Sequence, residues 1–285
     1  MRRVAGLVAL LAAGVSASAS APRPAGLDPY YRQIAAVRGL PVVASARVDR
    51  RAIRAVRAMA GGMLANRPDL AQWLAANRYR ITVMARDEAL LDLPEFRHWT
   101  KPAPDDPRLT RCEVKHYAER IGTKTDRQYW DARVRGIGGQ VMVAAEENVL
   151  GLPLDRYRGE TIFVHEFAHQ IFDAIRSADA ALFAQIESAY AAAKRDGLWR
   201  DEYTMTTVDE YWAEGSQFWF DSNRLQVFDG RRVLNHGDLA AYDPRLARLL
   251  GEVYGQTHRL TRDPFWRHPA RVPAGPPPLN TAEVC

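Results

Sequence analysis

The strongest constraint on the fold of this 285-residue chain is residues 161–172, which read T-I-F-V-H-E-F-A-H-Q-I-F. Apolar residues recur here with the spacing of a buried helix, and we expect a helix over residues 160–177. His165 and His169 are four residues apart, so on a helix both imidazoles project from the same face. Glu166 follows the first histidine directly, which completes the pattern HExxH.

An HExxH pattern on a helix predicts a zinc site. The two histidines can bind one Zn²⁺, and Glu166 can reach a water on that metal. A metal-bound water has a pKa lowered towards about 7, and a nearby carboxylate can accept its proton as it attacks a carbonyl. We therefore expect one zinc ion per chain.

Catalytic zinc sites keep three protein ligands, so a third ligand is needed. Phe172 and Ile175 exclude the metzincin pattern, which has Gly and His at these positions. Further along the chain, Glu210 and Glu214 share one face of a predicted helix over residues 208–221. Glu210 can bind the metal, and Glu214 can accept a hydrogen bond from the far nitrogen of a ligand histidine. The alternative is a pair of solvent-facing glutamates, which the aromatic neighbours disfavour.

These motifs together resemble a known family. HEFAH at 165–169, ExxAE at 210–214 and Tyr203, seven residues before Glu210, are similar to the anthrax lethal factor-like zinc peptidases of the gluzincin group, which include the Pro-Pro endopeptidases. The resemblance covers residues 161–221, and Trp212 stands where the motif usually has Phe.

The resemblance implies a role for each motif residue. The three zinc ligands are His165, His169 and Glu210, and the general base is Glu166. Tyr203 is the hydroxyl that stabilises the developing oxyanion; a phenol near a metal can do this, and an ordinary half-buried loop tyrosine is the alternative.

The first 19 residues have the layout of a secretory signal peptide: Arg2 and Arg3, an apolar run, and a small-residue stretch with cleavage expected after Ala19. An uncleaved membrane anchor is the alternative. Removing this segment lowers the net charge from +5 to +3, which does not favour nucleic-acid binding. We expect a secreted or periplasmic protein, exported by a Sec-type signal, with no membrane span in the mature chain.

Export makes a disulfide between Cys112 and Cys285 the expected state of the two cysteines, with two free thiols as the alternative. We divide the chain into a linker over residues 20–27, a single catalytic domain over 28–263 and a Pro-rich tail over 264–285. We expect a monomer.

Apolar patterning predicts an α+β fold, predominantly helical with a small mixed sheet. The resemblance implies that this fold is zincin-like, with the HExxH helix at its active site. The remaining expected elements are helices over 49–60, 69–77, 179–195 and 244–254, strands over 79–85 and 140–145, and a surface loop over 87–110. Two helices come first, separated by Gly61 and Gly62. We interpret Glu146 and Glu147 as solvated, with contact to a substrate amine as the alternative.

The sequence therefore predicts an exported zinc-dependent metalloendopeptidase acting on a peptide or protein substrate. The segment from Gly136 to Val143 either pairs with an extended substrate or is an ordinary strand after a glycine turn. Two other functions stay open. One is a non-catalytic, zinc-stabilised binding protein of the cell envelope, and the other is a zinc amidase that acts on cell-wall peptide.

Overall fold

The computed structural model describes residues 23–107, 109–228 and 230–275. The predicted signal peptide, the first residues of the predicted linker, the end of the predicted tail and Cys285 lie outside these ranges. The disulfide therefore stays a prediction. Cys112 is buried in the short helix α3 (Arg111–Lys115). Among the described residues, no helix has the length and apolar character to cross a membrane.

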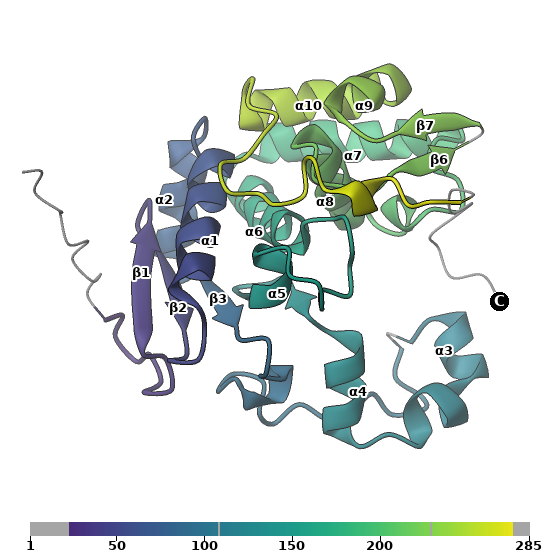
Figure 1. Ribbon diagram of the computed structural model, residues 1–285. Coiled ribbons are helices and arrows are strands. Elements are labelled where there is room, and N and C mark those ends of the chain that lie inside the picture. The colour runs from purple at the N-terminus through teal and green to yellow at the C-terminus, as the bar shows by residue number, and fades with distance from the viewer. Residues whose placement is uncertain (1–22, 108, 229, 276–285) are drawn as a thin grey trace, which may run out of the picture.

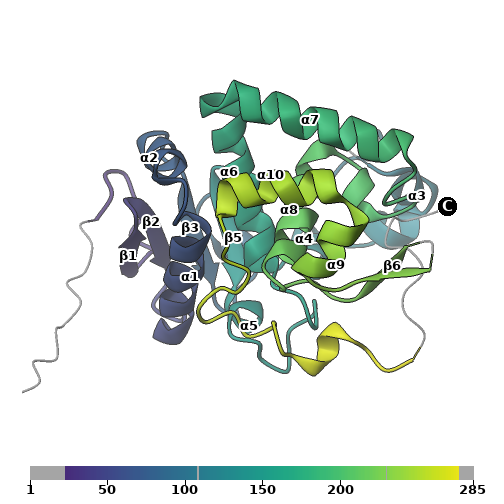
Figure 2. The ribbon, with the colours of Figure 1, turned by 90° about the horizontal axis from the view of Figure 1, so that it is seen from above.

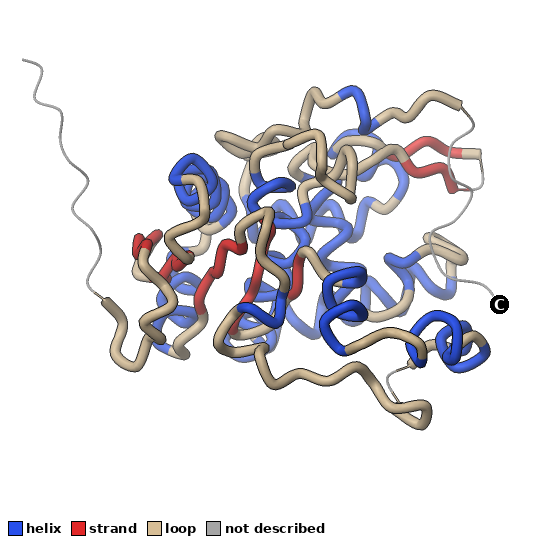
Figure 3. The backbone as a smooth tube through the Cα atoms, turned by 60° about the horizontal axis from the view of Figure 1, so that its bottom comes forward, coloured by secondary structure: helices blue, strands red, loops and turns tan. Residues whose placement is uncertain are grey.

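A five-stranded mixed sheet forms one half of the molecule, with its strands side by side in Figure 3. In sheet order the strands are β1 (Gln33–Val37), β2 (Leu40–Ala44), β3 (Arg80–Met84), β5 (Val141–Ala145) and β4 (Gly136–Ile137). The three inner strands are parallel to one another, and β1 and β4 run antiparallel to their neighbours. Strand β4 is therefore an edge strand, and it pairs Gly136 with Ala144 and Ile137 with Val143.

Both faces of the sheet are covered, which explains why its inner strands are almost continuously apolar. The helices α1 (Arg50–Met63), α2 (Pro68–Ala76) and α6 (Ile162–Ala178) lie on one face, where Met142 and Ala144 join the main core. On the other face, Val143 packs in a smaller core with Leu93 and Phe96. Helix α6 is thus held directly beside strands β5 and β4.

The other half of the molecule is helical and lies across α6 from the sheet (Figure 2). It consists of α7 (Ala180–Arg195), α8 (Val208–Trp219), α9 (His236–Tyr242), α10 (Pro244–Tyr254) and the hairpin β6 (Gln226–Phe228) and β7 (Arg231–Val233). The buried Asp243 connects these elements, because it caps α10 and accepts hydrogen bonds from the Tyr211 hydroxyl (2.7 Å) and the Trp199 indole (3.0 Å).

Between β3 and β4 the chain makes a long excursion, residues 86–134, which we call the 86–134 segment. Its short helices are η1 (Leu90–Asp92), α3, η2 (Ala118–Gly122) and α4 (Asp126–Arg133). Figure 1 shows α3 and α4 together at one end of the molecule, apart from α7 to α10. The remaining short helices are α5 (Glu146–Val149), η3 (Tyr203–Met205) and η4 (Pro269–Arg271).

Much of the expected secondary structure is present. The predicted strands over 79–85 and 140–145 correspond to β3 and β5, and the predicted helices over 69–77, 160–177, 179–195, 208–221 and 244–254 correspond to α2, α6, α7, α8 and α10. The mixed α and β composition with a small mixed sheet is as expected. The more specific zincin assignment stays a prediction.

Two expectations about the first half of the chain are wrong. The hairpin of β1 and β2 precedes the helices, and it turns at Arg38 and Gly39, both with positive φ. Gly61 and Gly62 do not end the first helix, because α1 continues to Met63. A Cβ on Gly62 would lie 2.8 Å from Leu260 Cδ2, so this glycine permits close packing and is not a break.

Two polar segments are also more buried than expected. The predicted surface loop over 87–110 contributes Leu90, Leu93 and Phe96 to the smaller core. Glu146 and Glu147 are not solvated, because their residues are 2% and 3% exposed. Each carboxylate has a partner: Glu146 accepts a hydrogen bond from the Asp49 amide (2.7 Å), and Glu147 binds a buried arginine described below.

Candidate metal centre

Helices α6 and α8 pack against each other and bring three predicted ligands to one point. His165 and His169 occupy successive turns of α6, and Glu210 lies in the first turn of α8, where Thr207 caps the helix through the Glu210 amide. The two Nε2 atoms are 3.2 Å apart, and Glu210 Oε2 lies 3.0 Å from His165 Nε2 and 3.6 Å from His169 Nε2. All three expected ligands therefore converge.

The spacing of these atoms fits a zinc ion. Tetrahedral zinc with ligand bonds of about 2.0–2.1 Å holds its ligand atoms roughly 3.3 Å apart. Glu210 Oε2 is buried and has no hydrogen-bond partner within the described structure. A buried carboxylate oxygen facing two imidazole nitrogens is a donor set that suits a divalent cation.

The electrostatics of the centre follow from burial and close charges. Burial lowers the pKa of His165, but its contacts with the carboxylates of Glu210 and Glu214 outweigh this, so its pKa is well above the ordinary value. For Glu210, burial raises the pKa, but the two histidines lower it by more. The centre therefore favours an ionised Glu210.

Glu166 lies beside the ligands and is enclosed by the glycines of β4 and the turn after it. Burial raises its pKa. A Cβ on Gly138 would lie 3.2 Å from Glu166 Oε2 and 3.2 Å from His169 Cβ, and a Cβ on Gly136 would lie 2.3 Å from Ile162 Cγ2. The glycines thus make room for the carboxylate, a role that the sequence pattern did not reveal.

A cleft of about 450 Å³ opens over the three ligands. Its lining residues are Gly136, Ile137, Gly138, Gly139, His165, Glu166, His169, Asp173, Tyr203, Asp209 and Glu210. The edge strand β4 forms one wall and the η3–α8 region forms another. The cleft therefore brings an edge strand, a carboxylate and the ligand cluster together, and its volume lies within the range of ligand-binding pockets.

Tyr203 belongs to this centre, as expected. Its hydroxyl donates a hydrogen bond to Glu210 Oε1 (2.9 Å), the carboxylate oxygen that faces away from the histidines. Burial of the hydroxyl, followed by the charge of Glu210, raises the pKa of Tyr203, so the phenol keeps its proton. The side chain is thus a hydrogen-bond donor at the wall of the cleft.

Glu214 lies on the far side of His165, as expected, but it is not the nearest group there. Its Oε1 is 3.4 Å from His165 Nδ1, whereas Gln217 Oε1 is 3.0 Å from the same nitrogen. Gln217 lies outside the HExxH and ExxAE motifs and is not among the residues predicted from the sequence. A signal was available, since residues 210, 214 and 217 follow the i, i+4, i+7 spacing of one helix face.

Comparisons with known proteins find similarity among solved structures. No family model matches the chain, and no curated protein matches it. Among solved structures, the chain is similar to the Pro-Pro endopeptidase PPEP-2 from Paenibacillus alvei, with 15% sequence identity and a TM-score of 0.42. This match covers 74% of the present chain and 96% of the other.

Proposed function

We propose that this chain is a zinc-dependent metallopeptidase. The observation that carries the proposal is the convergence of His165, His169 and Glu210 in a cleft that also holds Glu166 and the edge strand β4. The three ligands would hold the metal. When bound there, zinc supplies Lewis-acid chemistry, which polarises a carbonyl and lowers the pKa of a water molecule.

Glu166 is the group that moves protons in this proposal. Its carboxylate accepts a proton from the attacking water and then donates it to the departing amine of the cleaved bond. The lack of a side chain at Gly136 and Gly138 leaves room for this carboxylate beside the ligands. A position directly beside the ligands brings Glu166 within reach of both the water and the leaving group.

Tyr203 and β4 supply binding and stabilisation. The Tyr203 hydroxyl donates a hydrogen bond to Glu210 and therefore lies close to the ligands. From there it can donate to the oxyanion that develops on the scissile carbonyl. Within the described residues, strand β4 pairs with β5 along one edge only, and both of its residues, Gly136 and Ile137, line the cleft. An extended peptide that pairs with this edge would lie across the ligand cluster.

Export is part of the proposal and depends on residues 1–19 alone. Their charged start, apolar run and small-residue end are typical of a Sec signal. Secretion of a fusion of these residues to a reporter, with cleavage after Ala19, is the expected result. Retention of the reporter in the cytoplasm would contradict it.

The experiment that tests the enzyme combines metal analysis with cleavage of a quenched random-peptide library. We expect one zinc per chain and cleavage that a chelator stops. Glu166→Gln is expected to keep zinc and to lose at least about 10³-fold in kcat, because only the proton-transfer group is removed. Glu187→Gln, an exposed acid on α7, is the matched control and should leave both unchanged.

Each other outcome would contradict one part of the proposal or favour another function. A Glu166→Gln protein with normal hydrolysis would remove the proposed base. Zinc without cleavage of any peptide would favour the binding protein, and cleavage confined to cell-wall peptide would favour the amidase. Absence of zinc after reconstitution would remove the metal centre altogether.

A further inference from the structure

The nitrogen of His165 that points away from the cleft has two acceptors within reach. Gln217 Oε1 lies 3.0 Å from Nδ1, within the normal range of a hydrogen bond. Glu214 Oε1 lies at 3.4 Å, beyond the 2.7–2.9 Å that is usual for a bond to an ionised carboxylate. The amide of Gln217 is therefore the nearer partner, although the carboxylate carries the charge.

The orientation of the Gln217 amide is fixed by its other end. Its Nε2 donates to the backbone carbonyl of Thr161 at 3.2 Å. A carbonyl can only accept, so the NH₂ group must face Thr161 and the amide oxygen must face His165. An acceptor at Nδ1 requires that Nδ1 carry the proton. In the neutral imidazole, which is the form that binds a metal, the lone pair is then on Nε2, which faces Glu210.

Thr161, whose carbonyl accepts from the Gln217 side chain, is itself fixed by two hydrogen bonds. Its hydroxyl donates to Asp263 Oδ1 (2.7 Å), and its amide donates to the Ser222 carbonyl (2.9 Å). Thr161 is fully buried, as is Gln217. The carbonyl that orients Gln217 is thus fixed by segments that come after α8 and after α10.

Glu214 is turned towards other partners. Its Oε2 accepts hydrogen bonds from Asn223 Nδ2 (2.9 Å) and Gln226 Nε2 (3.4 Å), both beyond the end of α8. These bonds hold its carboxylate at the side of His165 and leave the closest position to Gln217.

We propose that Gln217 is the positioning residue of the metal centre: it keeps the proton of His165 on Nδ1 and presents Nε2 to the metal. This inference rests on the proposed zinc site but not on the proposed hydrolysis. Groups that orient a ligand histidine typically contribute about 10- to 100-fold to metal affinity. We expect loss of the Gln217 acceptor to weaken zinc binding by about that factor.

The test compares zinc affinity in two variants of Gln217. A role in packing and a role in positioning predict opposite orders of affinity for these two variants. Gln217→Met has nearly the same shape and no acceptor, so packing alone would tolerate it better than Gln217→Glu, which buries a charge. Positioning predicts the reverse: zinc affinity falls about 10- to 100-fold in Gln217→Met and by less in Gln217→Glu, which keeps an oxygen for Nδ1–H. Zinc dissociation constants come from competition with a chromophoric chelator.

A second measurement reports the proton directly. In zinc-loaded protein with ¹⁵N-labelled histidine, the Nδ1–H of His165 should be visible by NMR and protected from exchange, and the protection should be lost in Gln217→Met. Gln33→Met is the matched control, because it removes a half-buried glutamine on β1 that donates to the carbonyls of Ser45 and Val48 and contacts no residue of the metal centre. It should change neither zinc affinity nor exchange.

The outcomes separate this inference from the proposed function. Wild-type protein that binds zinc but cleaves nothing would remove the peptidase and leave the role of Gln217 measurable. Unchanged zinc affinity and a protected Nδ1–H in folded Gln217→Met would overturn the inference alone. A loss of affinity in Glu214→Gln, with none in Gln217→Met, would assign the role to Glu214.

Discussion

Gly138 is the residue at which the smallest change should have the largest effect on chemistry. A Cβ here would come within 3.2 Å of both Glu166 Oε2 and His169 Cβ, closer than ordinary van der Waals contact. The two neighbours belong to the proposed base and a proposed ligand, and they sit on a rigid helix. The added methyl would therefore displace the carboxylate or the β4 edge.

We predict that Gly138→Ala lowers kcat by about 10- to 100-fold, because a shift of about 1 Å in a catalytic group has effects of this size. Zinc content and the free energy of unfolding should change little. Gly61→Ala is the matched control, since its Cβ would have only an ordinary contact with Val37 Cγ2, at 3.5 Å, inside a helix. Full activity in Gly138→Ala would mean that Glu166 is not confined by this glycine.

The residues of the site could be predicted only where their relation is local in sequence. His165, Glu166 and His169 lie within five consecutive residues of one helix, so spacing alone gives their geometry. Helical spacing places Gln217 on the same face as Glu210 and Glu214, but spacing does not give the role of Gln217 or of Gly138. Their roles depend on which atom of another element they face, and that is decided by the packing of α8 and β4 against α6.

At the scale of elements, the start of helix α6 is the point that most needs support. Its first amide, on Ile162, has no partner within the helix and donates instead to Asn148 Oδ1 at 2.9 Å. The preceding Thr161 is fixed through Asp263, which also accepts hydrogen bonds from the Ser222 hydroxyl (2.6 Å) and the Phe265 amide (2.8 Å). The segment after α10 thus anchors the helix that carries the centre.

We predict that Asp263→Ala destabilises the protein by about 3 kcal/mol, because it leaves three buried donors without an acceptor. Urea unfolding followed by circular dichroism measures the change. Asp131→Ala, which removes an exposed carboxylate on α4, should cost no more than about 0.5 kcal/mol. Equal stability of the two variants would show that Asp263 is not an anchor.

The sequence predicts a helix or strand correctly where the apolar residues of that element follow a regular spacing. Helices such as α6 and α10 have a clear apolar face and were expected close to their observed bounds. The hairpin of β1 and β2 was missed. Its strands read Q-I-A-A-V and L-P-V-V-A, without regular alternation. Strand β2 is an inner strand buried on both faces, and the edge strand β1 is half-buried along its whole length.

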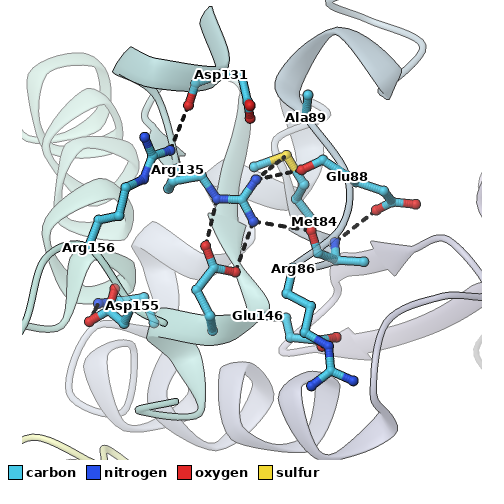
Figure 4. A network of polar contacts seen from close by, with 12 residues as sticks. Met84, Arg86, Glu88, Ala89, Asp131, Arg135, Glu146, Asp155 and Arg156 are labelled. Carbon is cyan, nitrogen blue, oxygen red and sulfur yellow. Dashed lines mark hydrogen bonds and ion pairs between the residues drawn. The ribbon is translucent and has the colours of Figure 1, made fainter. Parts of the chain in front are cut away.

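At the scale of the whole molecule, Arg135 forms a buried ion pair at the point where the two ends of the 86–134 segment meet (Figure 4). Arg135, just after the segment ends, binds Glu147 through two bonds, Nε to Oε1 (2.6 Å) and Nη2 to Oε2 (2.9 Å). The same guanidinium donates to the carbonyls of Ala85 and Glu88, where the segment begins. Arg135 also directly precedes Gly136, the first residue of the edge strand that lines the cleft.

This arrangement makes Arg135 the connection between the segment, the sheet and the site. Arg135 and Glu147 have side chains that are 6% and 4% exposed, so neither charge can be solvated if the other is removed. Breaking a buried pair in this way typically costs about 3–5 kcal/mol, whereas replacing both partners by apolar residues of similar volume is close to neutral.

We predict that Arg135→Met lowers the free energy of unfolding by about 3–5 kcal/mol and makes the 86–134 segment more susceptible to limited proteolysis. Adding Glu147→Met should recover most of the stability, because the uncompensated carboxylate is then gone. In the double variant the carbonyls of Ala85 and Glu88 still lack their donor beside the edge strand β4. The enzyme's cleavage of a peptide substrate should therefore recover less than its free energy of unfolding does. Urea unfolding and proteolysis of the two single variants and the double variant give the coupling. Additive effects would show that the pair does not hold the segment to the sheet.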